Sequence, residues 1–339
     1  MLMCMFILFM KLLLIAVVAT HAVLTPELYW KYMLPPATPM PKYVADLLHP
    51  TGGGSVFHCD VTDFHPNVEE YFTGYGNHKS TYYPQEYFTG YGNPKSTYSE
   101  ESFTGYANHK SEAKLPDNPD ITLFFLGKDL KAGHKMNLIF HKSPNQACFL
   151  PRDVVKSIPF SSTEMAEILN KFAVKPGSIS AEVMKNTIKE CEEPGIKGED
   201  KYCATSLESM LDLTILKLGR NVQALSTEVV TKKEETKKQE YTITNGVKKV
   251  GETNLVVCHK MNYAYAVFYC HKIENTVAYT VSLEGADGSR VKAVSVCPRD
   301  TSAWDPKHLA FQMLKVKPGS VPICHFLFQD TIAWLPKQN

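Results

Sequence analysis

The chain has 339 residues, an apolar fraction of 44% and nearly balanced charge, with 36 Lys and Arg against 35 Asp and Glu. At roughly 100–200 residues per domain, this length suggests one or two folded units with additional segments. The apolar fraction is close to the globular average, which excludes wholesale disorder. A formal net charge of +1 argues against a nucleic-acid binder held by a general basic field.

The N-terminus is the only candidate for the roughly 20 uninterrupted apolar residues of a membrane span. Residues 1–24 are almost wholly apolar, with Lys11 as the only charge and a short hydrophobic run from Leu12 to Ala19. The small residue Ala22 follows at the expected cleavage site, as in secretory signal peptides. We predict a signal peptide over 1–22 and a secreted chain that does not span the membrane once the signal is removed. The alternative is a signal anchor that stays in the membrane.

Nine cysteines occur, and Cys4 would leave with the signal peptide. An even number would then remain in a secreted chain, which predicts disulfide bonds whose pairing cannot be deduced from sequence. These cysteines are Cys59, Cys148, Cys191, Cys203, Cys258, Cys270, Cys297 and Cys324.

Two segments precede the expected domain. Residues 23–69 are rich in proline and aromatic residues and include Gly52-Gly53-Gly54, so we predict an extended segment with little to build a core. Residues 70–111 repeat one unit three times around the kernel Phe-Thr-Gly-Tyr, with phenylalanines at Phe72, Phe88 and Phe103. The units are short, polar and rich in Gly, Asn and Ser, so we predict flexible turns with exposed aromatic side chains. The alternative is a slipped duplication that carries no role.

From residue 121 the pattern predicts an α+β domain over 121–339, with helices first and an antiparallel β region after them. Ile121–Phe125 resembles a strand, and a capping box from Ser161 to Glu164 precedes a helix over 165–172. Further helices are expected over 181–192 and from Thr205 to a C-cap at Gly219. Alternating patterns then predict strands over 222–230, 241–244, 254–258, 263–270, 277–283, 291–297 and 321–327, with a hairpin turn at Asp287-Gly288.

Histidines accompany the cysteines of the β region in a regular series. Cys258-His259 is followed after ten residues by Cys270-His271, and the series ends with Cys297 and Cys324-His325. Successive side chains of a strand point to opposite faces, so sulfur and imidazole would separate, and the cysteines could staple strands on one face. Imidazole-only ligation suits copper, zinc or iron, with copper highest in intrinsic affinity, whereas zinc-finger spacing is not matched. The candidate metal ligands are His259, His271, His308 and His325. The alternative is a set of ordinary half-buried histidines beside structural disulfides.

This series resembles the C-terminal signature of plant BURP-domain proteins, which consists of four Cys-His pairs. Supporting matches are Phe124-Phe125-Leu126, the run from Tyr202 to Met210 and the run from Ala266 to His271. The likeness is greatest to the dehydration-responsive subgroup, while the Phe-Thr-Gly-Tyr units are similar to repeats of the polygalacturonase non-catalytic subunit. The sequence departs from the signature at Cys297-Pro298, where the third histidine is missing.

The resemblance implies a secreted protein of the apoplast or cell wall, or alternatively of the vacuole. It implies a non-enzymatic part in a stress or developmental response, with wall polysaccharide or a wall protein as partner. It also implies disulfides among the signature cysteines and Cys191 and Cys203, which leaves Cys59 and Cys148 as a further expected pair.

Some members of the family are copper-dependent autocatalytic peptide cyclases, which gives the alternative function. In those proteins a core peptide N-terminal to the domain is crosslinked through a Tyr or Trp side chain. The resemblance then implies copper as cofactor and Tyr75, Tyr91 and Tyr106 as the crosslinked phenols of a ribosomally synthesised peptide precursor. With Pro298 in place of a histidine, a site built from four imidazoles would be weakened or rearranged.

Overall fold

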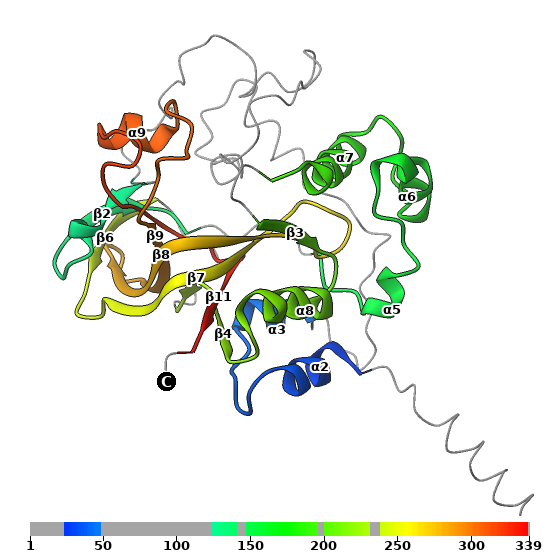
Figure 1. Ribbon diagram of the computed structural model, residues 1–339, viewed down its shortest axis with the longest axis horizontal. Helices are drawn as coiled ribbons and strands as arrows, with labels where there is room; N and C mark the ends of the chain where they lie inside the picture. The colour runs from blue at the N-terminus through cyan, green and yellow to red at the C-terminus, as the bar shows by residue number, and fades with distance from the viewer. Residues whose placement is uncertain are drawn as a thin grey trace, which may run out of the picture.

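The computed structural model describes residues 24–48, 122, 124–140, 147–195, 200–230 and 238–337. The expected signal peptide over 1–22, the repeats over 70–111 with Tyr75, Tyr91 and Tyr106, and Cys59 lie outside the described residues. The described part combines helices with an antiparallel sheet, which confirms the predicted fold class (Figure 1). None of the helices described is long and apolar enough to cross a membrane.

An antiparallel sheet lies at the centre of the fold (Figure 1). Its main path runs through seven strands in the order β1 (Phe125–Leu126), β10 (Ile323–Phe326), β9 (Arg290–Pro298), β8 (Phe268–Gly285), β7 (Lys248–Lys260), β11 (Thr331–Pro336) and β4 (Val222–Leu225). Shorter strands extend the path at its sides: β2 (Lys135–Leu138) pairs with β6 (Gln239–Ile243), β6 and β3 (Asp200–Ala204) pair with β8, and β5 (Glu228–Val229) pairs with β9. Strands β7, β8 and β9 therefore form the spine on which the candidate site is built.

Strand β8 is longer than the sequence predicted and begins later. It runs from Phe268 to Gly285 as one strand, where the sequence predicts strands over 263–270 and 277–283. The residues before it form a loop that is closed by a hydrogen bond from the amide of Met261 to the carbonyl of Val267, 2.8 Å long. Tyr263 and Tyr265 in this loop are fully buried in a cluster with residues of the neighbouring helices. Their alternation therefore reflects burial under helices rather than pairing in a sheet.

The predicted hairpin turn between β8 and β9 is confirmed. Gly288 has a φ of +78°, in the region that favours glycine, and its amide donates to the carbonyl of Gly285 over 2.9 Å. The turn sets the register of the two strands, which pair from Glu284 opposite Arg290 to Thr276 opposite Pro298. The second half of the signature is therefore held in fixed register with β8.

Helices of the middle of the chain lie at one end of the sheet, and among them α8 packs directly on its strands (Figure 1). They are α5 (Arg152–Val155), α6 (Met165–Lys171), α7 (Ile179–Glu192) and α8 (Leu207–Leu218), with α9 (Leu309–Leu314) further along the chain and short 3-10 turns at Gly127–Asp129 and Ser162–Glu164. Helix α8 buries Leu207, Met210 and Leu211 in one cluster with Trp334 of β11. Its predicted end is confirmed, because Gly219 follows it with a φ of +81°.

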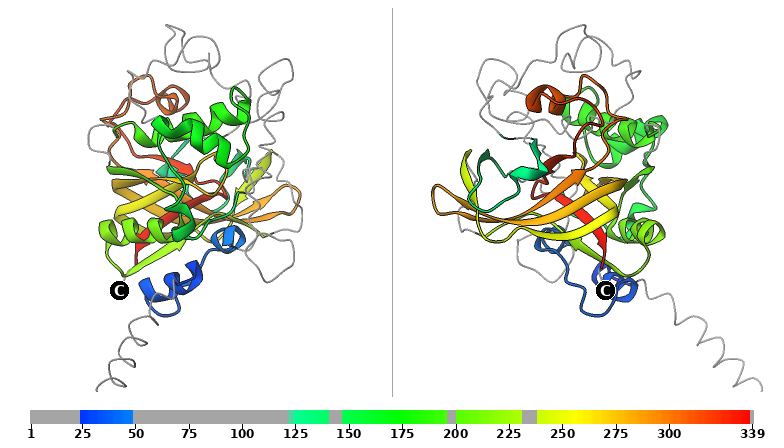
Figure 2. Two further views of the ribbon diagram at one scale, coloured as in Figure 1. Left: turned by 90° about the vertical axis from the view of Figure 1, so that its right-hand side faces the viewer. Right: turned by 60° about the vertical axis from the view of Figure 1, so that its left-hand side comes forward.

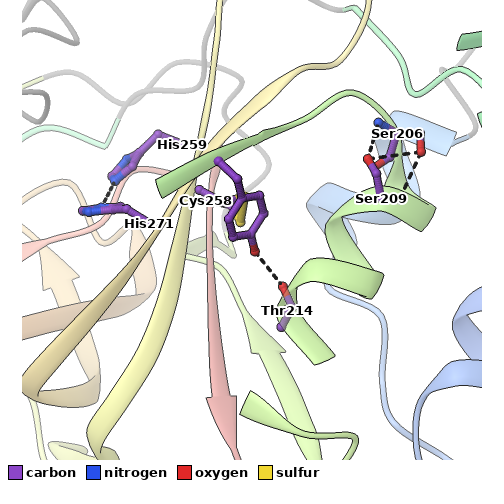
Figure 3. The surroundings of a disulfide bond; sticks show 8 residues. Ser206, Ser209, Thr214, Cys258, His259 and His271 are labelled. Carbon is purple, nitrogen blue, oxygen red and sulfur yellow. Dashed lines mark hydrogen bonds between the residues drawn. A yellow bond between two sulfur atoms is a disulfide. The ribbon is translucent and has the colours of Figure 1, made fainter. Parts of the chain in front are cut away.

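The helix starts differ from the predicted capping residues. Helix α8 begins after Ser206, whose hydroxyl accepts from the amide of Ser209 over 3.1 Å, while the Ser209 hydroxyl accepts from the Ser206 amide over 3.0 Å (Figure 3). The predicted box from Ser161 to Glu164 does not form. Ser161 accepts from the amide of Thr163 and donates to Glu192 at the end of α7 over 2.9 Å. The Glu192 carboxylate also accepts from the amide of Ser162 over 2.8 Å, so a residue from the end of α7 bonds to the start of this turn.

The N-terminal segment is helical, whereas the sequence predicts an extended chain with little to build a core. It forms α2 (Pro26–Met33) and α3 (Lys42–Leu48), which lie at the end of the molecule that also holds α8 and the C-terminus (Figure 2). Pro26 stands at the start of α2, where a helix needs no amide donor, so this proline does not oppose helix formation. Trp30 and Val44 are buried in the same cluster as Trp334.

Candidate metal centre

Two disulfides join directly opposed residues of neighbouring strands. We call Cys258–Cys270 the first staple and Cys297–Cys324 the second staple. The first staple joins β7 to β8 and the second joins β9 to β10, and the two Cα atoms are 4.0 Å apart in both. The sulfur atoms are buried, the first staple in the α8 side of the core and the second beside Phe125 and Phe326. The predicted stapling of strands by these cysteines is therefore confirmed.

The other cysteines of the described residues are also oxidised. Cys191 at the end of α7 bonds to Cys203 of β3, with Cα atoms 5.7 Å apart, so α7 is fixed to the edge of the sheet. Cys148 is disulfide-bonded as well, and its partner lies outside the described residues. Only Cys4 and Cys59 remain to be that partner. The pairing of Cys59 with Cys148 stays a prediction.

His259 and His271, which follow the cysteines of the first staple, lie on the opposite side of the β7–β8 hairpin from its sulfur atoms (Figure 3). His259 stands opposite Tyr269 and His271 stands opposite Val257, one pleat away from the opposed cysteines. The two imidazoles meet across the hairpin with their Nε2 atoms 3.3 Å apart. The expected separation of sulfur and imidazole is therefore present at this hairpin.

His325 and His308 both lie beside Phe124, whose ring centroid is 6.2 Å from that of His325 and 5.5 Å from that of His308. His325 lies on β10, and its Nδ1 is 3.3 Å from the carbonyl oxygen of Phe326. A nitrogen facing a carbonyl carries the proton, so Nε2 of His325 keeps its lone pair. His308 precedes α9, and its Nδ1 accepts from the amide of Ala310 over 3.2 Å. His308 therefore serves as a helix cap, which places its proton on Nε2.

Burial lowers the pKa of His259, His308 and His325, which keeps these three imidazoles neutral. It lowers the pKa of His259 well below its usual range, with further lowering from the neighbouring His271 and His325. It lowers the pKa of His325 to about 4, where the Phe326 carbonyl opposes the shift and His271 and His308 add to it. It also lowers the pKa of His308 to about 4, against the attraction of Asp305. Because His271 and His325 act on His259, and His271 and His308 act on His325, we call His259, His271, His308 and His325 the histidine cluster.

The donor chemistry of the histidine cluster fits a metal that prefers imidazole. Neutral imidazole nitrogen is a ligand for copper, zinc and iron. Two nitrogens bound at about 2.0–2.1 Å to one tetrahedral ion would stand about 3.3 Å apart, which is the separation between His259 and His271. The same separation also suits a direct N–H···N hydrogen bond. No group of three or more His, Cys, Asp or Glu side chains in the described part of the chain is arranged to hold a metal ion.

Pro298 occupies the position of the histidine that the signature lacks. It ends β9 opposite Thr276 and is buried. It lies two residues beyond Val296, the residue opposite His325, so its side chain leaves the sheet on the face of His325. The fold therefore places this position on the same face of the sheet as His325, and proline supplies no donor there.

Aromatic side chains surround the histidine cluster, and the sequence did not single them out. Trp304 lies 4.7 Å from His308 between ring centroids, Phe311 lies 6.0 Å from the same ring, and Tyr269 lies 5.7 Å from His271. Trp304 is only four residues before His308, which is the one local signal that could have indicated it. The rings of Trp304 and Phe311 contribute to the burial that lowers the pKa of His308.

Comparison with known proteins agrees with the signature. Residues 123–336 match the BURP domain. The BURP domain protein RD22 of Arabidopsis thaliana is 50% identical over 228 residues, which are 66% of this chain and 58% of that protein. The BURP domain-containing protein 5 of Oryza sativa subsp. japonica is 41% identical over 317 residues, which are 93% of this chain and 88% of that protein. The chain therefore belongs to the BURP-domain family.

Proposed function

We propose that this chain is a secreted, cell-wall-associated plant protein that acts without catalysis in a stress or developmental response. The observation that carries the proposal is the oxidised state of every cysteine in the described residues, Cys148 included. Disulfides persist in oxidising compartments and are rare in reducing ones. An apolar leader over 1–22 supports the same route, and the apoplast or cell wall is its destination.

Pro298 supports a role without catalysis. The position is brought to the face of His325, and it carries no group that binds a metal or moves a proton. His308 is meanwhile engaged as the cap of α9. The disulfide framework does not depend on either residue, so the fold suits a binding role toward wall polysaccharide or a wall protein.

A localisation experiment tests this proposal. The full chain is expressed in plant cells with a C-terminal fluorescent protein, and the cells are plasmolysed so that wall and plasma membrane separate. We expect fluorescence to stay with the wall, and we expect a matched variant that lacks residues 1–22 to stay inside the cell. Fluorescence of the full chain in the cytosol would contradict the proposal, and fluorescence in the vacuole would replace the wall as its destination.

A second candidate is a copper-dependent autocatalytic peptide cyclase that crosslinks Tyr75, Tyr91 and Tyr106 of its own repeats. The Nε2 separation of 3.3 Å between His259 and His271 favours it, because these two atoms suit a shared ion. Bound copper would supply one-electron oxidation of a phenol, with dioxygen as the final acceptor of the two hydrogens removed. In this candidate His259 and His271 would bind the ion through their paired Nε2 atoms, and His325 would have to move in as a third ligand.

Mass spectrometry separates the two candidates. Purified protein is incubated with Cu(II) in air, digested and mapped, with Zn(II) as the control because zinc has no redox chemistry. A crosslink removes two hydrogens, so a loss of about 2 Da in a Phe-Thr-Gly-Tyr peptide supports the cyclase. A His271→Phe variant should then lose the modification. Unchanged peptide masses with copper bound exclude this second candidate and leave the first.

A further inference from the structure

The N-terminal segment packs on the rest of the protein through apolar side chains. Trp30 and Trp334 lie 5.4 Å apart between ring centroids, and both are almost fully buried. Helix α3 adds a continuous buried face. The buried apolar residues of the segment are Trp30, Leu34, Tyr43, Val44, Leu47 and Leu48. They share one cluster with residues of α8, β4, β7 and β11, so the segment completes a core instead of lying on a surface.

Polar contacts fix the orientation of α2. The guanidinium of Arg152 donates to Asp212 of α8 over 2.6 Å and lies 5.0 Å from the ring centroid of Tyr29. Tyr29 donates its hydroxyl to the other oxygen of Asp212. At the far end of α2, Arg220 donates to the carbonyl oxygens of Tyr32 over 2.8 Å and of Met33 over 3.1 Å. These carbonyls have no partner within the helix, so a cation there stabilises its C-terminal end.

Two more contacts hold the remainder of the segment. The amide of Phe149 donates to the carbonyl of Leu47 over 3.0 Å, which joins α3 to the chain before α5. The ammonium of Lys337, just after β11, donates to the hydroxyl of Thr38 over 2.8 Å. The polar anchors therefore come from three separate parts of the chain, residues 149–152, residues 212–220 and Lys337, and none of them depends on how residues 49–121 connect the two pieces.

We propose that the face formed by α8, β4, β7 and β11 is a binding surface for residues 24–48, and that this segment stays bound as a separate peptide after the chain is cut behind it. The match to the BURP domain begins at residue 123 and so leaves this segment out. Without the segment, Trp334 and the apolar side of α8 would face water. Cleavage between residues 48 and 122 therefore releases no N-terminal peptide from the folded protein.

A cut full-length chain tests the proposal. A recognition sequence for a site-specific protease is inserted after Gly54 in a chain that carries Cys4→Ser. The N-terminal piece then contains no cysteine, so no disulfide can hold it. After cleavage is complete on a denaturing gel, the pieces are separated by size-exclusion chromatography under native conditions and identified by mass. We expect both pieces in one peak, and elution of the N-terminal piece on its own overturns the proposal.

Two variants of α2 form a matched pair. Trp30→Ala removes a buried anchor, whereas Leu28→Ala alters a side chain that is 49% exposed on the same helix. We expect the N-terminal piece to leave at least about tenfold faster in Trp30→Ala and at an unchanged rate in Leu28→Ala. If Trp30→Ala does not fold, Arg220→Ala, at an exposed position, takes its place and should also speed release. Equal release from the anchor variant and from Leu28→Ala would overturn the assigned surface.

Discussion

The first and second staples are alike in the backbone and differ in the residue that follows each cysteine. Each joins directly opposed residues of antiparallel neighbours, with Cα atoms 4.0 Å apart. The first staple is followed on both strands by an imidazole, and His259 and His271 meet behind it. The second staple is followed by Pro298 on β9, so only one of its strands brings an imidazole.

The comparison separates the framework of the fold from its candidate chemistry. A cross-strand disulfide needs two cysteines in register, and the residue behind each one points to the opposite face. Replacement of that residue therefore leaves the staple intact, as Pro298 shows behind Cys297. In this chain the staples hold the strands of the sheet together, and the residue that follows each stapling cysteine determines which groups the opposite face offers for binding.

Removal of a whole staple should have the largest effect. Closure of a loop gives a stabilisation of about 3 kcal/mol for the first staple and about 3.5 kcal/mol for the second, from sequence separations of 12 and 27. We expect the double variants Cys258→Ala/Cys270→Ala and Cys297→Ala/Cys324→Ala to lose roughly these amounts of unfolding free energy in urea titrations. Pairs of alanines leave no free thiol to form a new bond.

The same variants distinguish the two staples by their metal binding. Without the first staple, no covalent bond fixes the register that brings His259 to His271. The Cu(II) affinity of this variant should therefore fall together with its unfolding free energy. Without the second staple, Cu(II) affinity should change less, because its strands supply one imidazole. Isothermal titration calorimetry in buffer without denaturant, at a pH of about 7, measures the Cu(II) affinity of both double variants. An equal loss of Cu(II) affinity in the two variants would contradict the expectation that the first staple supports metal binding more than the second.

Replacement of a single imidazole behind the first staple should have the next largest effect. We expect His271→Phe to lower Cu(II) affinity at least about tenfold, because it removes one of two nitrogens 3.3 Å apart. His308→Phe should lower affinity less and should also destabilise α9, whose first turn it caps. The control is His134→Phe, at a half-buried histidine outside the histidine cluster. A His271→Phe protein with unchanged affinity would show that the two imidazoles are only hydrogen-bonded.

Restoration of the missing imidazole should make the two staples alike. Pro298→His places a donor on the face of His325 at a position that the sheet already holds in register with β8. We expect Cu(II) affinity to rise by up to about tenfold, since a further ligand joins sites that the fold has positioned. Pro298→Ala is the matched control, because it removes the proline without adding a donor. An equal rise in Cu(II) affinity in Pro298→His and Pro298→Ala would show that loss of the proline, rather than the added imidazole, causes the effect.

The sequence predicted those features that depend on local alternation or on local capping geometry. The separation of cysteines from histidines follows from the strand pleat, and the turn at Gly288 and the end of α8 at Gly219 follow from glycine conformation. Strand β11 was missed because Thr331–Pro336 is buried on both faces and shows no alternation. The helix cap at His308 was missed because histidine is not a preferred capping residue.

The N-terminal helices were missed for a different reason. Helices α2 and α3 have only eight and seven residues, which is too short for a stable helix in isolation. They form because Trp30 and Val44 are buried against α8 and β11, elements that lie more than 150 residues further along the chain. Thr25 and Pro26 mark the start of α2 locally, but the burial that stabilises both helices comes from distant residues and is not visible in the local sequence. The contact of Phe124 with both His308 and His325 is missed on the same ground.

The smallest predicted effect is the acid sensitivity of the metal-free protein. His325 has a pKa of about 4 when folded, against about 6.5 in an unfolded chain. Below pH 6.5 the unfolded state binds a proton that the folded state excludes, so stability falls as the pH is lowered toward 4. We expect His325→Phe to lose about 1 kcal/mol less than the wild type between pH 7 and pH 5.5, measured by urea unfolding in chelator. A His325→Phe curve of unchanged slope would show that this imidazole is not held neutral by the fold.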